Sequence, residues 1–135
     1  MMQFFDTNVL IYAVINQIPE YRISSTRLIE TSIIQETLVI SPLVLSELIF
    51  SLNKLNLDIK LIEQEIDFYK NFSKFPIDLK TIEQAFALAV EINSLKNIND
   101  AIHLKFAEQY CDELITFDKD FKKFIPHTKI KITIL

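Results

Sequence analysis

Four acidic residues occupy positions from which they could build one site. Asp6 follows the apolar run 3–5, and Asp118 follows the run 113–117, so each comes at the end of a predicted strand. Glu47 lies inside a predicted helix, and Asp100 opens another. Four carboxylates without basic partners repel one another strongly unless they hold protons or hard cations. Because oxygen ligands suit Mg²⁺ and Mn²⁺, the pattern predicts a divalent metal site.

Each of these acids also has a purely structural interpretation. Asp6 could cap the helix that follows it, and Asp118 or Asp120 could cap a short helix of their own. Asp100 would be favoured in a first helical turn by the helix dipole. Glu47 could belong to an ordinary solvent-facing stripe. The prediction of a site therefore depends on the four acids occurring together, in this order and at these ends.

The composition excludes several other kinds of site. The 135 residues include no glycine, whereas phosphate-binding loops, dinucleotide-binding fingerprints and nucleophile elbows all need residues without a Cβ. The one cysteine, Cys111, rules out an internal disulfide and a multi-cysteine zinc site. A single cysteine also fits a reducing compartment, so we expect a cytoplasmic protein.

Charge and hydropathy leave the choice of partner open. A formal net charge of −4 argues at first against nucleic acid. However, five lysines lie between residues 119 and 131, and metal bound to four carboxylates would leave the rest near neutral. Residues 1–15 lack the basic start of a signal peptide, and the apolar stretch 38–52 is too short and too polar to span a bilayer. We therefore expect no membrane partner. The 50% hydrophobic content hints at apolar surface left for a partner or a second copy.

The acids need a framework that alternates strands with helices. The sequence predicts strands over residues 3–5, 37–40, 113–117 and 129–135. It predicts helices over residues 8–15, 23–35, 42–53, 58–72, 81–95 and 99–110, with a short helical turn over 118–124. The clearest start signal is Ser41 as N-cap with Pro42 at the first helical position.

Strands separated by helices pair in parallel through right-handed crossovers. We therefore expect an α/β fold in a single domain over residues 1–135. Its architecture would be a three-layer α/β/α sandwich with a small, mainly parallel central sheet. Ligands of such sheets bind beyond the carboxyl ends of the strands, where Asp6 and Asp118 fall.

Four segments together resemble the successive motifs of PIN-domain nucleases. The resemblance covers nearly the whole chain and is greatest to the small VapC-type toxins of toxin–antitoxin pairs. The first and last motifs are fairly specific, whereas Ser-Glu-Leu is weak on its own. The segments are Asp6-Thr7-Asn8-Val9-Leu10-Ile11-Tyr12, Ser46-Glu47-Leu48, Asn99-Asp100-Ala101-Ile102-His103-Leu104 and Thr116-Phe117-Asp118-Lys119-Asp120-Phe121.

The resemblance implies a metal-dependent ribonuclease that hydrolyses RNA phosphodiesters with Mg²⁺ or Mn²⁺. It also implies a cognate antitoxin that covers the acidic cleft, and a homodimer. Asp6 and Asp100 would be the strongest candidates for direct metal ligands, and Asp120 rivals Asp118 for the fourth acid. The family's residues fall on the catalytic and metal-binding acids Asp6, Glu47, Asp100 and Asp118 and on the auxiliary residues Thr116, Asn8 and Asp120.

Other interpretations stay open beside this one. His103 lies three residues after Asp100, and a packed or hydrogen-bonded role is favoured over metal ligation. Asn97 stands where many relatives have glycine, and asparagine tolerates the left-handed conformation. The chain could also be a catalytically silent PIN-like module that binds RNA or protein. A phosphatase of another α/β fold is disfavoured, because such enzymes commonly need a second aspartate where this chain has Asn8.

Overall fold

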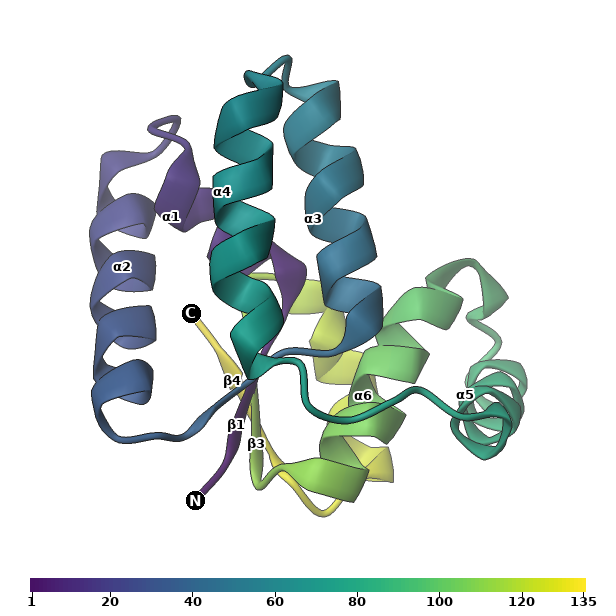
Figure 1. Cartoon of the computed structure of the whole chain (residues 1–135). Coiled ribbons are helices and arrows are strands. Elements are labelled where there is room, and N and C mark those ends of the chain that lie inside the picture. The colour runs from purple at the N-terminus through teal and green to yellow at the C-terminus, as the bar shows by residue number, and fades with distance from the viewer.

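The computed structural model describes all 135 residues and has a four-stranded parallel sheet with helices on both faces (Figure 1). The strands run in the order β2-β1-β3-β4, and β1 pairs Phe4 with Val39 on one side and with Leu114 on the other. Every pairing is parallel, so the predicted α/β fold with a parallel central sheet is confirmed. The strands are β1 (Gln3–Phe5), β2 (Leu38–Val39), β3 (Glu113–Thr116) and β4 (Lys131–Ile134).

The strand order explains the layering of the helices. The chain leaves β1 for β2 on one side and later returns past β1 to β3 on the other. Right-handed crossovers in opposite directions place their helices on opposite faces of the sheet. Accordingly, α1 and α2 lie on one side and α5 and α6 on the other, while α3 and α4 form a hairpin (Figure 1). The helices are α1 (Thr7–Val14), α2 (Pro19–Ile34), α3 (Pro42–Lys54), α4 (Ile59–Tyr69), α5 (Leu79–Glu91) and α6 (Ile98–Tyr110), with 3₁₀ turns η1 (Lys70–Phe72), η2 (Leu95–Asn97) and η3 (Lys119–His127).

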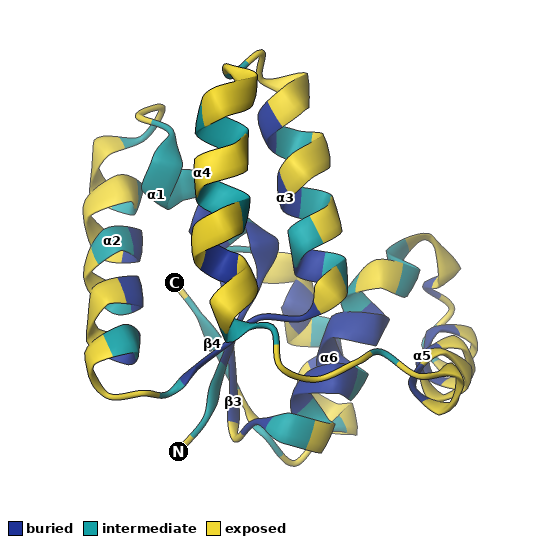
Figure 2. Ribbon diagram, viewed as in Figure 1, coloured by how far each residue is buried: buried dark blue, intermediate teal, exposed yellow.

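The core includes residues of the sheet and of helices on both of its faces, and α6 contributes more buried residues than any other helix. Phe4 of β1 and Leu114 of β3 are fully buried, and so are Leu104 and Phe106 of α6. Burying each of these side chains contributes about 2–3 kcal/mol. Figure 2 shows α6 largely dark blue, whereas α2 and α4 keep yellow outer faces. The helix that carries Asp100 is therefore the most firmly held one. None of the helices combines the length and apolar character needed to cross a membrane.

Helix starts follow the local capping chemistry. Ser41 caps α3 as predicted, because its Oγ accepts a hydrogen bond from the Val44 amide at 3.1 Å. The expected start of the second helix at residue 23 was too late, since Pro19 fits the first helical position and begins α2. Likewise α5 begins before residue 81, because the Asp78 side chain caps it by accepting from the Thr81 amide.

Three residues adopt the left-handed conformation in this glycine-free chain. Glu36, Asn56 and Asn93 have φ angles of 56°, 60° and 53°. The expectation for Asn97 was wrong, since its φ is −104°. Asn93, directly after α5, makes that reversal instead, so α5 ends at Glu91 and not at residue 95. Asparagine adopts the left-handed conformation more readily than glutamate does, so among these three residues Glu36 has the highest conformational energy.

Candidate active site

A polar cavity of about 590 Å³ opens where β1 and β3 end. The four predicted acids Asp6, Glu47, Asp100 and Asp118 all line it, and so does Asn8. The cavity lies at the point where the strand order reverses, between β1 and its neighbour β3. Thus segments more than a hundred residues apart in sequence bring their carboxylates to one place.

Asp6 is the most enclosed of the acids, with 6% of its surface exposed. Its Oδ1 accepts a hydrogen bond from the Thr7 amide at 2.7 Å, so it does cap α1. Its Oδ2 accepts from Thr116 Oγ1 at 2.7 Å and from Asn8 Nδ2 at 3.2 Å. Burial raises the pKa of Asp6, although the His103 charge and the hydrogen bonds from Thr116 and Thr7 act in the opposite direction. The capping role and the site role therefore coexist in one side chain.

Thr116 and Asn8 tie the end of β1 to the end of β3. The Thr116 hydroxyl donates to Asp6 and accepts from Asn8 Nδ2 at 3.1 Å and from the Asp118 amide at 2.9 Å. These bonds use its one donor and both its lone pairs. Asn8 Oδ1 in turn accepts from the Phe117 amide at 3.1 Å. Two of the three residues predicted to be auxiliary, Thr116 and Asn8, therefore fix where the acids of the two strands lie.

Asp118 and Asp120 are placed differently. Asp118 lines the cavity, and its Oδ1 accepts from the Asp120 amide at 2.8 Å, which caps η3. Asp120 is exposed, and its side chain is not among those that line the cavity. Geometry therefore favours Asp118 as the fourth acid.

Glu47 is held by three side chains, one of which is a buried histidine. Its Oε1 accepts from Thr7 Oγ1 at 2.6 Å and lies 2.6 Å from His103 Nε2, and its Oε2 accepts from Asn99 Nδ2 at 3.3 Å. Burial would raise the pKa of Glu47, but the hydrogen bond and charge of His103 outweigh it and lower that pKa. The interpretation that Glu47 merely belongs to a solvent-facing stripe of its helix is therefore wrong.

His103 belongs to the site more closely than its sequence position suggested. It is 1% exposed, and its Nε2 also lies 3.7 Å from Asp6 Oδ1. Burial would lower the pKa of the imidazole, but the bond to Glu47 and the charges of the acids raise it overall. The predicted hydrogen-bonded role is the one observed. The available signal was its place three residues after Asp100, which puts both on one helical face.

Asp100 keeps the least compensated charge of the four acids. Its one hydrogen bond is from Asn97 Nδ2 at a long 3.4 Å. Burial raises the pKa of Asp100 to about 6, and the negative charge of Asp6 adds to this shift. The charges of Asp118 and Glu47 contribute less, and His103 acts in the opposite direction. Even a protonated His103 would offset only one of the four carboxylate charges, so the cavity is negatively charged when the acids are ionised.

The donor groups suit a hard divalent cation. Asp6, Glu47 and His103 offer ligand atoms that lie within 4.8 Å of one another. Asp100 and Asp118 add carboxylate oxygens on the same cavity. Carboxylate oxygens with uncompensated charge are the environment in which Mg²⁺ and Mn²⁺ bind. The residues present thus fit the metal that the sequence pattern predicts.

Two of the five C-terminal lysines have structural partners. Lys123 Nζ donates to Ser94 Oγ at 2.9 Å and to Asn97 Oδ1 at 2.6 Å, and Lys131 lies 3.4 Å from Glu113. Lys119, Lys122 and Lys129 are exposed and have no ion-pair partner. Cys111 is buried, and its burial together with the charge of Asp112 raises the pKa of its thiol to about 12, which makes the thiol unreactive.

Comparison with known proteins identifies a family. A model of the PIN domain matches residues 4–125, which include all four acids. Among curated proteins, none is significantly similar in sequence.

Solved structures share the fold at low sequence identity. VapBC2 from Rickettsia felis, solved bound to a promoter DNA fragment, superposes with a TM-score of 0.73 at 19% identity, covering 100% of this chain and 99% of that one. A toxin–antitoxin complex from Klebsiella pneumoniae gives 0.66 at 22%, covering 91% and 90%. VapBC-5 from Mycobacterium tuberculosis gives 0.64 at 17%, covering 99% and 98%.

Proposed function

The chain belongs to the PIN-domain family, and on that premise we propose that it is a metal-dependent endoribonuclease, the toxin of a VapBC-type toxin–antitoxin pair. The observation that carries the proposal is the cavity at the ends of β1 and β3, into which Asp6, Glu47, Asp100 and Asp118 converge. A site made of carboxylates, with no cysteine or serine nucleophile beside a base, suits phosphodiester hydrolysis by water.

Each acid has a distinct part in the proposed reaction. Asp6 and Asp100 would hold the ion directly, and Glu47 and Asp118 would hold a second ion or orient the attacking water. When bound, Mg²⁺ or Mn²⁺ would stabilise the charge that develops on the phosphate and lower the pKa of water. Thr116 and the other hydrogen-bond donors keep the carboxylates in position before the substrate arrives, which avoids reorganisation during the reaction.

The exposed lysines would contact the phosphate groups of the RNA. Lys119 and Lys122 lie in η3, directly after Asp118. Lysines contact the backbone without reading sequence, so they would position RNA across the acids rather than select it.

Two protein partners are part of the proposal. The likeness to three toxin–antitoxin complexes supports an antitoxin that keeps the nuclease inactive. A homodimer is supported by the exposed apolar side chains of the α3–α4 hairpin, where Ile49, Phe50 and Ile59 are 45%, 68% and 69% exposed. Sedimentation of the purified protein over a range of concentrations tests the dimer, and a monomer throughout would reject it.

Cleavage of a mixed RNA pool tests the enzymatic proposal. Wild-type protein is incubated with Mg²⁺, with Mn²⁺ and with EDTA, beside the variants Asp6→Asn and Asp100→Asn. The matched control is Glu83→Gln, which removes an exposed charge on α5. We expect metal-dependent cleavage by the wild type and the control and none by the two site variants. Metal binding without cleavage by any form would favour a catalytically silent binding module.

A further inference from the structure

Three aromatic rings meet where α1, α2 and the end of β3 come together. They belong to Tyr12 of α1, Tyr21 of α2 and Phe117, the residue that joins β3 to Asp118. The rings of Tyr21 and Phe117 are stacked, with their centroids 4.4 Å apart and an angle of 23° between the ring planes. Tyr12 meets each of them edge to face at 5.1 Å. These three side chains are called the aromatic cluster below.

The aromatic cluster is continuous with the acidic cavity along two segments of the chain. The Phe117 amide donates to Asn8 Oδ1 at 3.1 Å, and the next residue is Asp118. Tyr12 follows Asn8 by four residues on α1, so both lie on one face of that helix, about 6 Å apart along its axis. Asn8 and Asp118 both line the acidic cavity. The rings therefore lie where an RNA strand that leaves the acids would pass next.

The aromatic cluster lies outside the hydrophobic core. All three rings are partly exposed, and of the three only Phe117 packs against the buried core residues. Contacts between the rings hold them in one arrangement. The cluster is therefore an aromatic platform that is already formed in the free protein.

Cationic side chains flank the aromatic cluster. Arg22 follows Tyr21 on α2, and Lys119 follows Asp118 at the start of η3. Both cations are exposed, and neither takes part in an ion pair. Proteins bind single-stranded nucleic acid with this combination, because the rings stack on bases while the cations follow the phosphate backbone.

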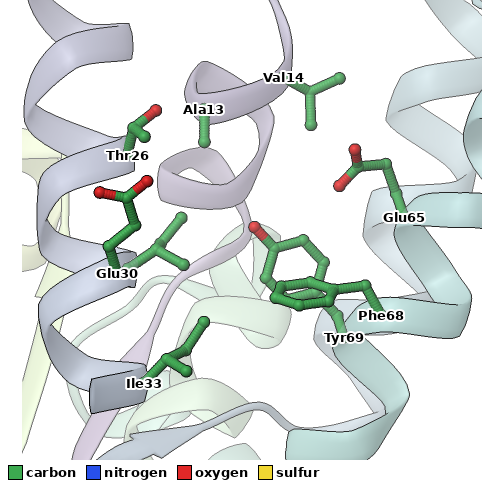
Figure 3. Close-up of a pocket in the computed structure, with 9 residues that line it drawn as sticks. Ala13, Val14, Thr26, Glu30, Ile33, Glu65, Phe68 and Tyr69 are labelled. Carbon is green, nitrogen blue, oxygen red and sulfur yellow. The ribbon is translucent and has the colours of Figure 1, made fainter. Parts of the chain in front are cut away.

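A separate pocket on the same helices is unsuited to RNA. It has a volume of about 280 Å³ and lies between α1, α2 and α4 (Figure 3). Figure 3 shows the carboxylates of Glu30 and Glu65 on its opposite walls, and no lysine or arginine lines it. Because these carboxylates would repel phosphate groups, the aromatic cluster is the better place for the strand.

We propose that the aromatic cluster stacks on one unpaired base of the RNA, next to the phosphate that the acids would hold. The inference depends on the proposed function for its substrate, and it narrows that substrate to single-stranded RNA, since a base inside a duplex has both faces covered. A base that extends the stack of Tyr21 and Phe117 would bring its phosphate toward Asp118. Every base has a π-face, so the cluster would position the RNA without reading its sequence.

Fluorescence of 2-aminopurine tests the proposal, because this base analogue is quenched when it stacks on an aromatic ring. A short single-stranded RNA carries the probe at one position at a time and is added in Mg²⁺ to the full chain with Asp100→Asn, so that the RNA stays intact. We expect quenching on binding for at least one probe position, and binding about tenfold weaker when the RNA is annealed to its complement. Bound RNA without quenching at any position overturns the proposal, and so does equally tight binding of the duplex.

Substitutions of Tyr21 separate the ring from the volume and the hydroxyl of the side chain. Tyr21→Leu keeps an apolar side chain without a ring and should weaken RNA binding about tenfold, within the range for loss of one stacked base. Tyr21→Phe keeps the ring and should bind within about twofold of the parent chain. The matched control is Phe86→Leu, which removes a 54% exposed ring from α5 and should change nothing. Unchanged binding by Tyr21→Leu, or equal losses for both Tyr21 variants, overturns the proposal.

Failure of this inference and failure of the proposed function give different results. In a chain that cleaves RNA, Tyr21→Leu should raise KM about tenfold and leave kcat within about twofold, because it removes binding alone. An unchanged KM in that assay overturns the base site and leaves the nuclease intact. Quenching of the probe by a chain that cleaves no RNA supports the base site and rejects the nuclease.

Discussion

Replacing Asp100 by asparagine should stabilise the metal-free protein while it disables the site. In the absence of metal, the pKa of Asp100 is about 6 instead of 3.8, because the side chain is partly buried and lies beside other carboxylates. An acid with a raised folded-state pKa binds its proton more tightly in the folded protein than in the unfolded chain. Stability is therefore lost as pH rises from about 4 to about 6 and stays lower above that range. Asparagine is neutral at every pH, so the variant does not incur this loss.

The size of the effect follows from the shift and the surroundings of the side chain. The whole shift corresponds to about 3 kcal/mol, which solvent screening at this partly exposed side chain roughly halves. The variant also loses the attraction between a negative charge and the start of α6, which is about 0.5 kcal/mol. A net gain of about 1 kcal/mol in the free energy of unfolding remains, and it should raise Tm by about 4 °C.

Thermal unfolding in EDTA at several pH values measures this gain. We expect Asp100→Asn and wild type to melt together near pH 4, to diverge as the pH rises from about 4 to about 6, and to keep a constant difference above that range. Glu83→Gln serves as the control for removal of an exposed negative charge. If Asp100→Asn melts at or below the wild-type temperature throughout the pH range, burial and neighbouring carboxylates do not destabilise the charged form of Asp100.

Three further perturbations probe other parts of the structure. Mg²⁺ at a hundred times its Kd should raise the free energy of unfolding of the wild type by about 2.7 kcal/mol, measured by thermal melting. Asp6→Asn should abolish this gain, and an equal gain in both proteins would contradict the metal site. His103→Leu should reduce the rate of RNA cleavage about 10- to 100-fold, because His103 positions Glu47. His103→Gln keeps a hydrogen-bond donor for Glu47 and should lose less activity. Equal cleavage rates for the two variants would show that His103 does not position Glu47. Glu36→Gly should raise the free energy of unfolding by about 1 kcal/mol in urea, because φ is 56° there; an unchanged midpoint would mean that this residue is not strained.

The elements that were predictable are those with a local chemical signal. Ser41-Pro42 located the start of α3, and the apolar run before Asp6 located β1. Boundaries failed where the signal was ambiguous. Pro19 can end one helix or begin the next, and only packing of α2 against α1 and β2 decides. Asn97 and Asn93 are equally tolerant of positive φ, so the sequence alone did not distinguish them.

The acids could be proposed from sequence, but their hydrogen-bonding partners could not. Positions after strands and in first helical turns identify Asp6, Asp100 and Asp118 as candidates, since strand ends meet at one edge. The bond between Glu47 and His103 joins α3 to α6 and depends on how the two helices pack. The raised pKa of Asp100 likewise arises from burial and from neighbours distant in sequence. Such properties exist only in the folded chain.

The hydrogen bond between Thr116 and Asp6 spans 110 positions in the sequence, and this separation has a consequence for the time at which the protein becomes active. A ribosome adds about 5–20 residues per second, so β1 waits roughly 5–20 seconds for its neighbour β3. During that interval Asp6 has neither its hydroxyl donor nor Asp100 and Asp118 beside it. A site built in this way stays incomplete while the chain is being translated, and a chain interrupted before residue 113 never acquires it.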